Sequence, residues 1–62
     1  MKGFRFITAS GLDIYIADRN KIILVANSDD PRNKTNLFLP EDDYSFWVIA
    51  KPIDELIKEL EA

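Results

Sequence analysis

The chain has 62 residues, a formal net charge of −3 and 47% hydrophobic residues, which describes one small globular domain rather than a disordered chain. It contains neither cysteine nor histidine, so disulfides and every site that needs a thiolate or an imidazole are excluded. No apolar run approaches the roughly 18 residues of a membrane span, and the first residues lack a signal-peptide pattern. We therefore expect a cytoplasmic protein without membrane insertion.

The first half of the chain predicts three strands. Residues 4–8 are rich in β-formers, and turn chemistry around Gly11 leads to a second β-rich run at 13–17, which together predict a hairpin. After a polar break, the continuous apolar run within 22–27 predicts a strand that is buried on both faces. Residues 28–34 then have loop composition and are expected to be the most mobile part of the chain.

The second half predicts two more strands and one helix. Residues 35–39 predict a strand that ends at Pro40, and residues 44–51 predict the last strand. In residues 52–61 the apolar spacing becomes helical, at Ile53, Leu56, Ile57 and Leu60. The order predicts an α+β, mostly β domain over residues 1–62. A five-stranded antiparallel meander carries one C-terminal helix, and we favour closure into an SH3-like small barrel.

The layout of apolar runs and turns resembles a known family. The segments that carry the likeness are Phe6-Ile7-Thr8 before Gly11, Ile14-Tyr15-Ile16, Ile22-Ile23 with Val25, Leu37-Phe38-Leu39, Trp47-Val48 and the helix at 53–60. In these the chain resembles the small flagellar FlbD/SwrD family, whose members start with two strands around a tight turn and end with a short acidic amphipathic helix. The resemblance implies a partner in the motility apparatus.

The residues for enzyme chemistry are few. Without histidine or cysteine, a general base or nucleophile would have to come from other side chains held in a pocket. The serines lie at turn-like or solvent-facing positions, at Ser10, Ser28 and Ser45. We therefore predict no catalytic residue, no cofactor site and no enzyme activity.

Two acidic clusters are candidate surface sites: Asp29 with Asp30, and Glu41 with Asp42 and Asp43. Neither has the alternating spacing and the glycine of a calcium loop, so solvated acidic turns explain them better than a metal site. A second interpretation gives them a function. They would imitate phosphate charge on a basic host protein, which makes the chain a small acidic inhibitor or phage-type modulator.

The aromatic side chains permit a third interpretation, a small-barrel nucleic-acid binder. Seven rings are available for base stacking, namely Phe4, Phe6, Tyr15, Phe38, Tyr44, Phe46 and Trp47. The chain offers four basic residues near these rings, but they are interrupted by Asp13 and Asp18, so no basic stripe accompanies the rings. They are Lys2, Arg5, Arg19 and Lys21. Core packing explains the rings better, and nucleic-acid binding is not favoured.

The chain has more apolar residues than one sheet face can hide. Alternate strand residues point to opposite faces, so a core of Phe6, Ile14, Ile16, Leu37, Leu39, Phe46 and Val48 directs another set outward. That set is Ile7, Tyr15, Phe38, Trp47 and Ile49. Either the helix covers it or another chain does.

The stability of so short a chain favours another chain. Apolar burial contributes roughly 90 kcal/mol, and ordering the residues costs about the same. Our leading hypothesis is therefore a non-enzymatic protein-interaction module that self-associates or docks on a larger protein through the outward set.

Overall fold

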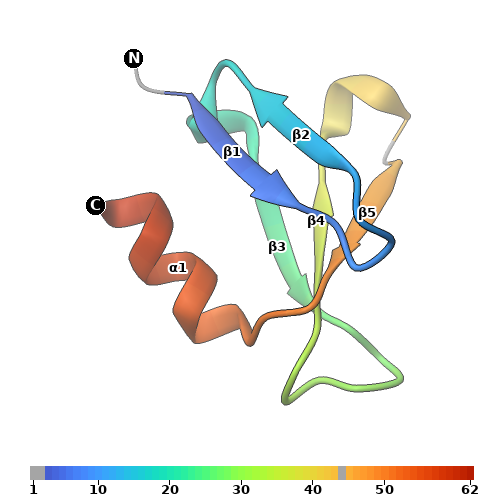
Figure 1. Cartoon of the computed structure of the whole chain (residues 1–62). Coiled ribbons are helices and arrows are strands. Elements are labelled where there is room, and N and C mark those ends of the chain that lie inside the picture. Colours follow the sequence, from blue (N-terminus) through green and yellow to red (C-terminus); the bar gives the residue numbers. More distant parts are fainter. Residues whose placement is uncertain (1–2, 44) are drawn as a thin grey trace.

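The computed structural model describes residues 3–43 and 45–62, which form five strands and one α-helix (Figure 1). Tyr44, at the start of the predicted fifth strand, lies outside these residues. The elements are β1 Phe4–Ile7, β2 Asp13–Ile16, β3 Ile23–Ala26, β4 Thr35–Phe38, β5 Phe46–Ile49 and α1 Ile53–Glu61, with short 3₁₀ turns η1 Arg19–Lys21 and η2 Pro40–Asp42. The predicted order of five strands and a terminal helix is confirmed, and every strand lies within its predicted range.

The strands pair as an antiparallel meander in two sheets. β1 and β2 form a hairpin, with Phe4 opposite Ile16, and β4 is the central strand of a second sheet in the order β3-β4-β5. The hairpin crosses one face of the three-stranded sheet (Figure 1). Closure into a barrel is not seen, because strand pairing within the described ranges stays in these two sheets.

A backbone hydrogen bond joins the two sheets just after β1. The Ala9 N–H donates to the Val48 carbonyl of β5 at 2.7 Å. The turn before β2 is held by Thr8, whose hydroxyl accepts from the Leu12 N–H at 2.9 Å. Gly11 has a φ of 93° in this turn, a conformation that glycine adopts without steric cost. The sequence at the turn therefore fixes how the hairpin meets β5.

The core lies between the hairpin, the three-stranded sheet and α1. Its buried hydrophobic residues are Phe4, Phe6, Leu37, Ile49 and Leu56. The helix lies beside β1 and β3 and contributes the fully buried Leu56 (Figure 1). Thr35 is fully buried as well, and its hydroxyl donates to the Lys51 carbonyl at 2.8 Å, so β4 holds the segment that leads into the helix.

The inward and outward faces of β5 are reversed relative to the prediction from its sequence. Ile49 is buried and Trp47 packs against the core, with its ring edge-on to Phe6 at a centroid distance of 5.9 Å. Phe46 is exposed, although it was expected inside. The residues that alternate along this strand are apolar in both sets, so the register with β4 decides which set faces the core. Trp47 pairs with Leu37, which is itself buried.

β3 was predicted to be buried on both faces, and this prediction is wrong for one of them. Leu24 packs against the core, whereas Ile23 and Val25 are exposed. The hairpin and the helix both cover the face that carries Leu24, so an apolar face is left on the other side of the sheet.

Candidate protein-interaction surface

The uncovered face of the three-stranded sheet is the main candidate site. Strand pairing arranges its side chains in two rows, because Phe38 lies opposite both Ile23 and Phe46, and Asn36 lies opposite both Val25 and Val48. We call these six residues the outer sheet face: Ile23, Val25, Asn36, Phe38, Phe46 and Val48.

The outer sheet face is largely apolar, partly exposed and uncharged. Ile23 is 44% exposed, Val25 46% and Phe46 51%, while the other three are half-buried. The rings of Phe38 and Phe46 contact each other at a centroid distance of 5.0 Å. Contiguous exposed apolar residues with few charges have the composition of the centre of a protein interface.

Asn36 is the one polar member of the face. Its Oδ1 accepts a hydrogen bond from the Asn27 Nδ2 at 2.9 Å. Among the residues that the structure describes, the Asn36 Nδ2 has no hydrogen-bond partner. Since Oδ1 keeps a second lone pair, Asn36 can still offer both a donor and an acceptor.

Charged side chains lie at one end of the face rather than on it. The Lys21 Nζ forms an ion pair with the Glu41 carboxylate, between η1 and η2. The hydrogen bond to Glu41 and the charge of that carboxylate raise the pKa of Lys21 above its usual value. The polar loop at residues 27–34, between β3 and β4, lies at the other end of the face. The face therefore has polar surroundings and an apolar centre.

The residues predicted as one interaction surface do not form one. Ile7 and Tyr15 are exposed on the outer side of the hairpin, and Phe38 belongs to the outer sheet face. Trp47 and Ile49 belong to the core, which corrects the prediction that they point outward. The helix lies on the core side, so it does not cover the outer sheet face.

The hairpin side is a poorer interaction surface than the outer sheet face. An ion pair between Arg5 and Asp13, at 3.3 Å, lies among its apolar residues. Tyr15 packs directly over Gly3, where a Cβ would clash with the phenol ring. Tyr15 therefore has a packing role inside the chain.

Sequence reasoning missed five members of the outer sheet face: Ile23, Val25, Asn36, Phe46 and Val48. In β5 the residues at both alternations are apolar, so the sequence alone did not distinguish the two faces. In β3 the continuous apolar run carried no sign of exposure. The signal that could have found them is strand pairing. Leu37 on the central strand β4 is buried, so the residues that pair with it in β3 and β5 also face the core, and their neighbours in sequence face outward.

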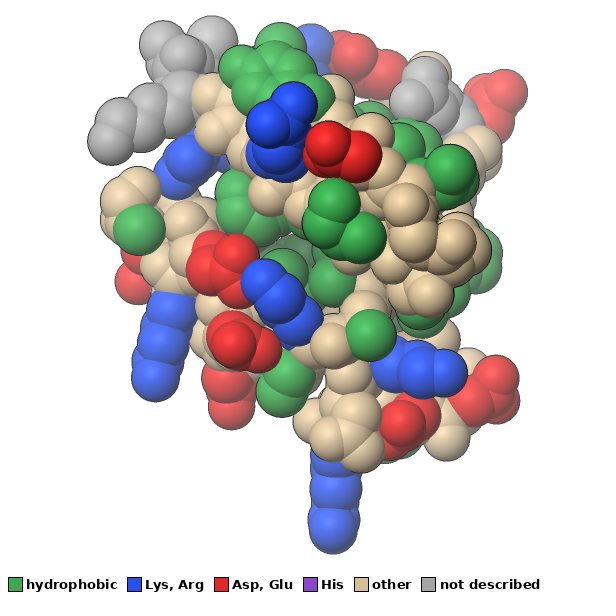
Figure 2. All heavy atoms as spheres, in the orientation of Figure 1, with side chains coloured by type: hydrophobic (Ala, Val, Ile, Leu, Met, Phe, Trp, Pro, Cys, Tyr) green, Lys and Arg blue, Asp and Glu red, His purple; other side chains and the backbone are tan. Residues whose placement is uncertain are grey.

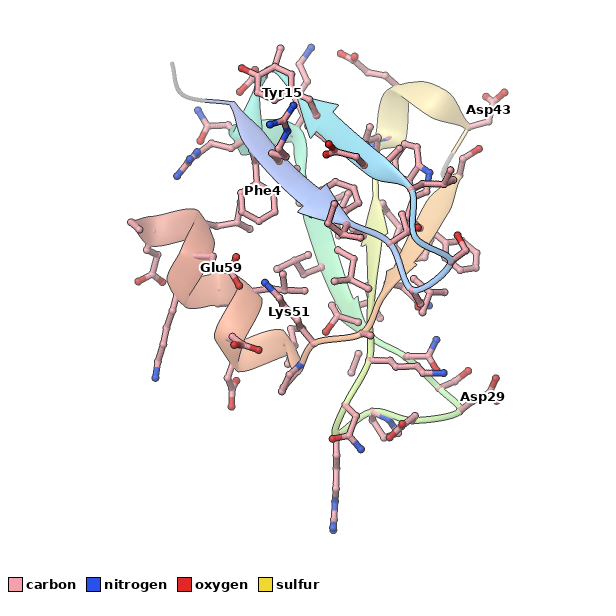
Figure 3. All side chains as sticks on the ribbon, viewed as in Figure 1. Phe4, Tyr15, Asp29, Asp43, Lys51 and Glu59 are labelled. Atoms are coloured by element: carbon pink, nitrogen blue, oxygen red, sulfur yellow. The ribbon has the colours of Figure 1, made fainter. Side chains whose placement is uncertain are left out.

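The acidic candidates are not brought together. Asp29 lies at the tip of the β3–β4 loop and Asp43 at the turn after η2, at the opposite end of the molecule (Figure 3). Asp30 belongs to the same loop as Asp29, while Glu41 is paired with Lys21. The side chain of Asp42 is outside the described part of the structure. Among the residues that the structure describes, no group of three or more acidic side chains could hold a metal ion. This separation disfavours the acidic-inhibitor interpretation.

Charges of both signs are mixed on the face that carries the hairpin. Figure 2 shows Lys and Arg side chains interspersed with Asp and Glu there, without a continuous region of either sign. Within the described ranges the chain has no pocket. The described helices include none that is long and apolar enough to cross a membrane.

Fold and site together define a small, mostly β domain with one exposed apolar sheet face. Comparison of the chain with protein-family models, with curated proteins and with solved structures gave no match. Function is therefore inferred from the outer sheet face.

Proposed function

We propose that the chain is a non-enzymatic, cytoplasmic protein-interaction module whose binding surface is the outer sheet face. The observation that carries this proposal is the exposure of Ile23, Val25 and Phe46 in one uncharged patch that no described element covers. Burial of each such side chain against a partner contributes about 1–2 kcal/mol.

Packing within the chain does not account for these residues. The core is already formed on the other face of the same strands, by Leu37 and Ile49 with Leu56 of the helix. Polar residues on the outer sheet face would leave that core unchanged. An interface gives its apolar composition a physical reason.

Site-specific crosslinking in cells tests the proposal. A photoreactive amino acid at Phe46 is expected to give a discrete crosslinked species, because this side chain is exposed at the edge strand of the patch. The matched control is the same amino acid at Ile57, which is 41% exposed on the helix. A smear from both positions, or no product from Phe46, would contradict an interaction through this face.

The resemblance to the flagellar family suggests where the partner of this chain is found. If it reflects a shared role, the partner belongs to the motility apparatus. Genes for flagellar proteins beside this gene would support that source, whereas phage or mobile-element genes would favour a modulator of a host protein.

A further inference from the structure

We propose that the outer sheet face is an isologous interface for a second copy of this chain, with a two-fold axis running parallel to β4. This inference rests on the proposed function and names its partner. In such a contact the same patch serves on both sides, so the patch must be complementary to itself.

The charge distribution meets this requirement. All six residues of the outer sheet face are uncharged, while the net charge of −3 comes from side chains elsewhere. Two copies therefore bring no like charges together at the centre of the contact. A strongly charged partner would find no opposite charge on the face to select it.

Asn36 is the strongest reason for a second copy. It lies on the central strand, and an axis along β4 places it opposite the Asn36 of the second copy. Each Nδ2 then donates to the other copy's Oδ1, while that Oδ1 still accepts from Asn27 within its own chain. A purely apolar partner would bury the Nδ2 donors of Asn36 without acceptors.

The two edge strands complement each other under the same axis. β3 lies over β5 of the second copy, so the branched side chains Ile23 and Val25 face Phe46 and Val48. Phe38 meets its own counterpart beside the asparagine pair. Aligned sheets pack through such interdigitated side chains.

The size of the face predicts a weak dimer. Four residues along a strand and three strands across span about 13 Å by about 14 Å. Such a face is smaller than the roughly 800 Å² that each partner buries in a standard interface. We therefore expect reversible dimerisation with a dissociation constant on the order of 10 μM to 1 mM.

The test uses the purified full chain and the substitution Asn36→Asp. An aspartate has the same shape and still accepts the hydrogen bond from Asn27, so the fold is kept. Across the two-fold axis, however, two negative charges would meet. Sedimentation equilibrium should show a dimer in the wild type and at least about tenfold weaker association in the variant. Asn20→Asp adds the same charge on η1 and should leave dimerisation unchanged.

Two further measurements keep the inference falsifiable. Dilution of the wild type should shift the NMR signals of the outer sheet face and leave those of Tyr15 and Ile57 in place. Val25→Lys, at a 46% exposed position, should be a folded monomer even if Asn36→Asp proves unstable.

A wild type that stays monomeric at millimolar concentration would overturn the second copy as partner, as would an Asn36→Asp variant that dimerises like the wild type. The crosslink from position 46 separates the two proposals. A species of twice the chain mass supports both. A discrete species of another mass keeps the proposed function and overturns the second copy, and no species overturns both.

Discussion

The Arg19 guanidinium donates a hydrogen bond to the Leu60 carbonyl, so a side chain between β2 and β3 holds the C-terminal end of α1. The same nitrogen reaches the Ala62 carbonyl at 3.2 Å, and the second one donates to the Gly3 carbonyl at 2.9 Å. The last carbonyls of a helix have no partner within it, and a cation there also complements the helix dipole. Arg19 thus links Gly3, just before β1, to the C-terminal end of α1.

Arg19→Ala is therefore expected to lower the free energy of unfolding by about 1.5–3 kcal/mol, because charge-assisted hydrogen bonds to three carbonyls are lost. Chemical denaturation measures this change. Arg19→Lys should recover only part of it, since one ammonium cannot reproduce the planar fork. Full recovery with lysine would show that charge alone holds the helix end.

The β3–β4 loop depends on Asn27. Its Oδ1 accepts from the backbone N–H groups of Asp29 and Asp30, at 2.9 and 3.1 Å, while its Nδ2 binds Asn36. Asn27→Ala should therefore speed amide exchange at both aspartates and cost about 1–2 kcal/mol of stability. Ser28→Ala, at an exposed position of the same loop, is the control. Unchanged exchange in the Asn27 variant would show that the loop is held in another way.

Neighbouring residues of β5 should respond in opposite ways to the same substitution. Trp47→Glu places a charge against Phe6 in the core and is expected to unfold the chain. Phe46→Glu replaces a 51% exposed side chain and should leave the fold intact while it abolishes association. Thermal denaturation followed by circular dichroism distinguishes them. A folded Trp47→Glu variant would restore the original prediction for this strand.

The ion pair between Lys21 and Glu41 sets a pH dependence. Glu41 raises the pKa of Lys21 in the folded chain, so the stabilisation is present below the unfolded pKa and is lost as pH rises through the folded one. Lys21→Gln should therefore be less stable than the wild type at pH 8. The difference should begin to shrink above about pH 10.4, the usual pKa of lysine, and vanish only above the higher pKa of Lys21 in the folded chain. Denaturation at pH 8 and at a pH above that folded-state pKa measures it. A difference that persists at the higher pH would assign it to packing of the lysine stem.

Single-stranded nucleic acid is not expected to bind at physiological salt. Arg5 is paired with Asp13, and Lys21 with Glu41, so these cations are already neutralised within the chain. Phosphate binding would show a steep salt dependence, whereas stacking alone would show a shallow one. Titration of the protein into a fluorescently labelled oligonucleotide at several salt concentrations, followed by anisotropy, measures both. Micromolar binding that weakens with salt would contradict the expectation.

Local features of this protein could be predicted from its sequence. The apolar spacing of residues 53–60 predicts the helix, and Gly11 predicts the turn of the first hairpin, because both depend on neighbours in the chain. The order of strands followed by a helix determined the fold class in the same way. Phe38 was also correctly placed on an outward face.

The candidate site was decided by the tertiary structure. In β5 both alternations are apolar, so only pairing with β4 determines that Trp47 enters the core and Phe46 remains outside. The pairs that complete the structure are distant along the chain, since Arg19 binds a residue 41 positions away and Asn27 one 9 positions away. Local propensity carries no information about such contacts. The position of the hairpin and the helix on one side of the sheet makes the other side an exposed surface.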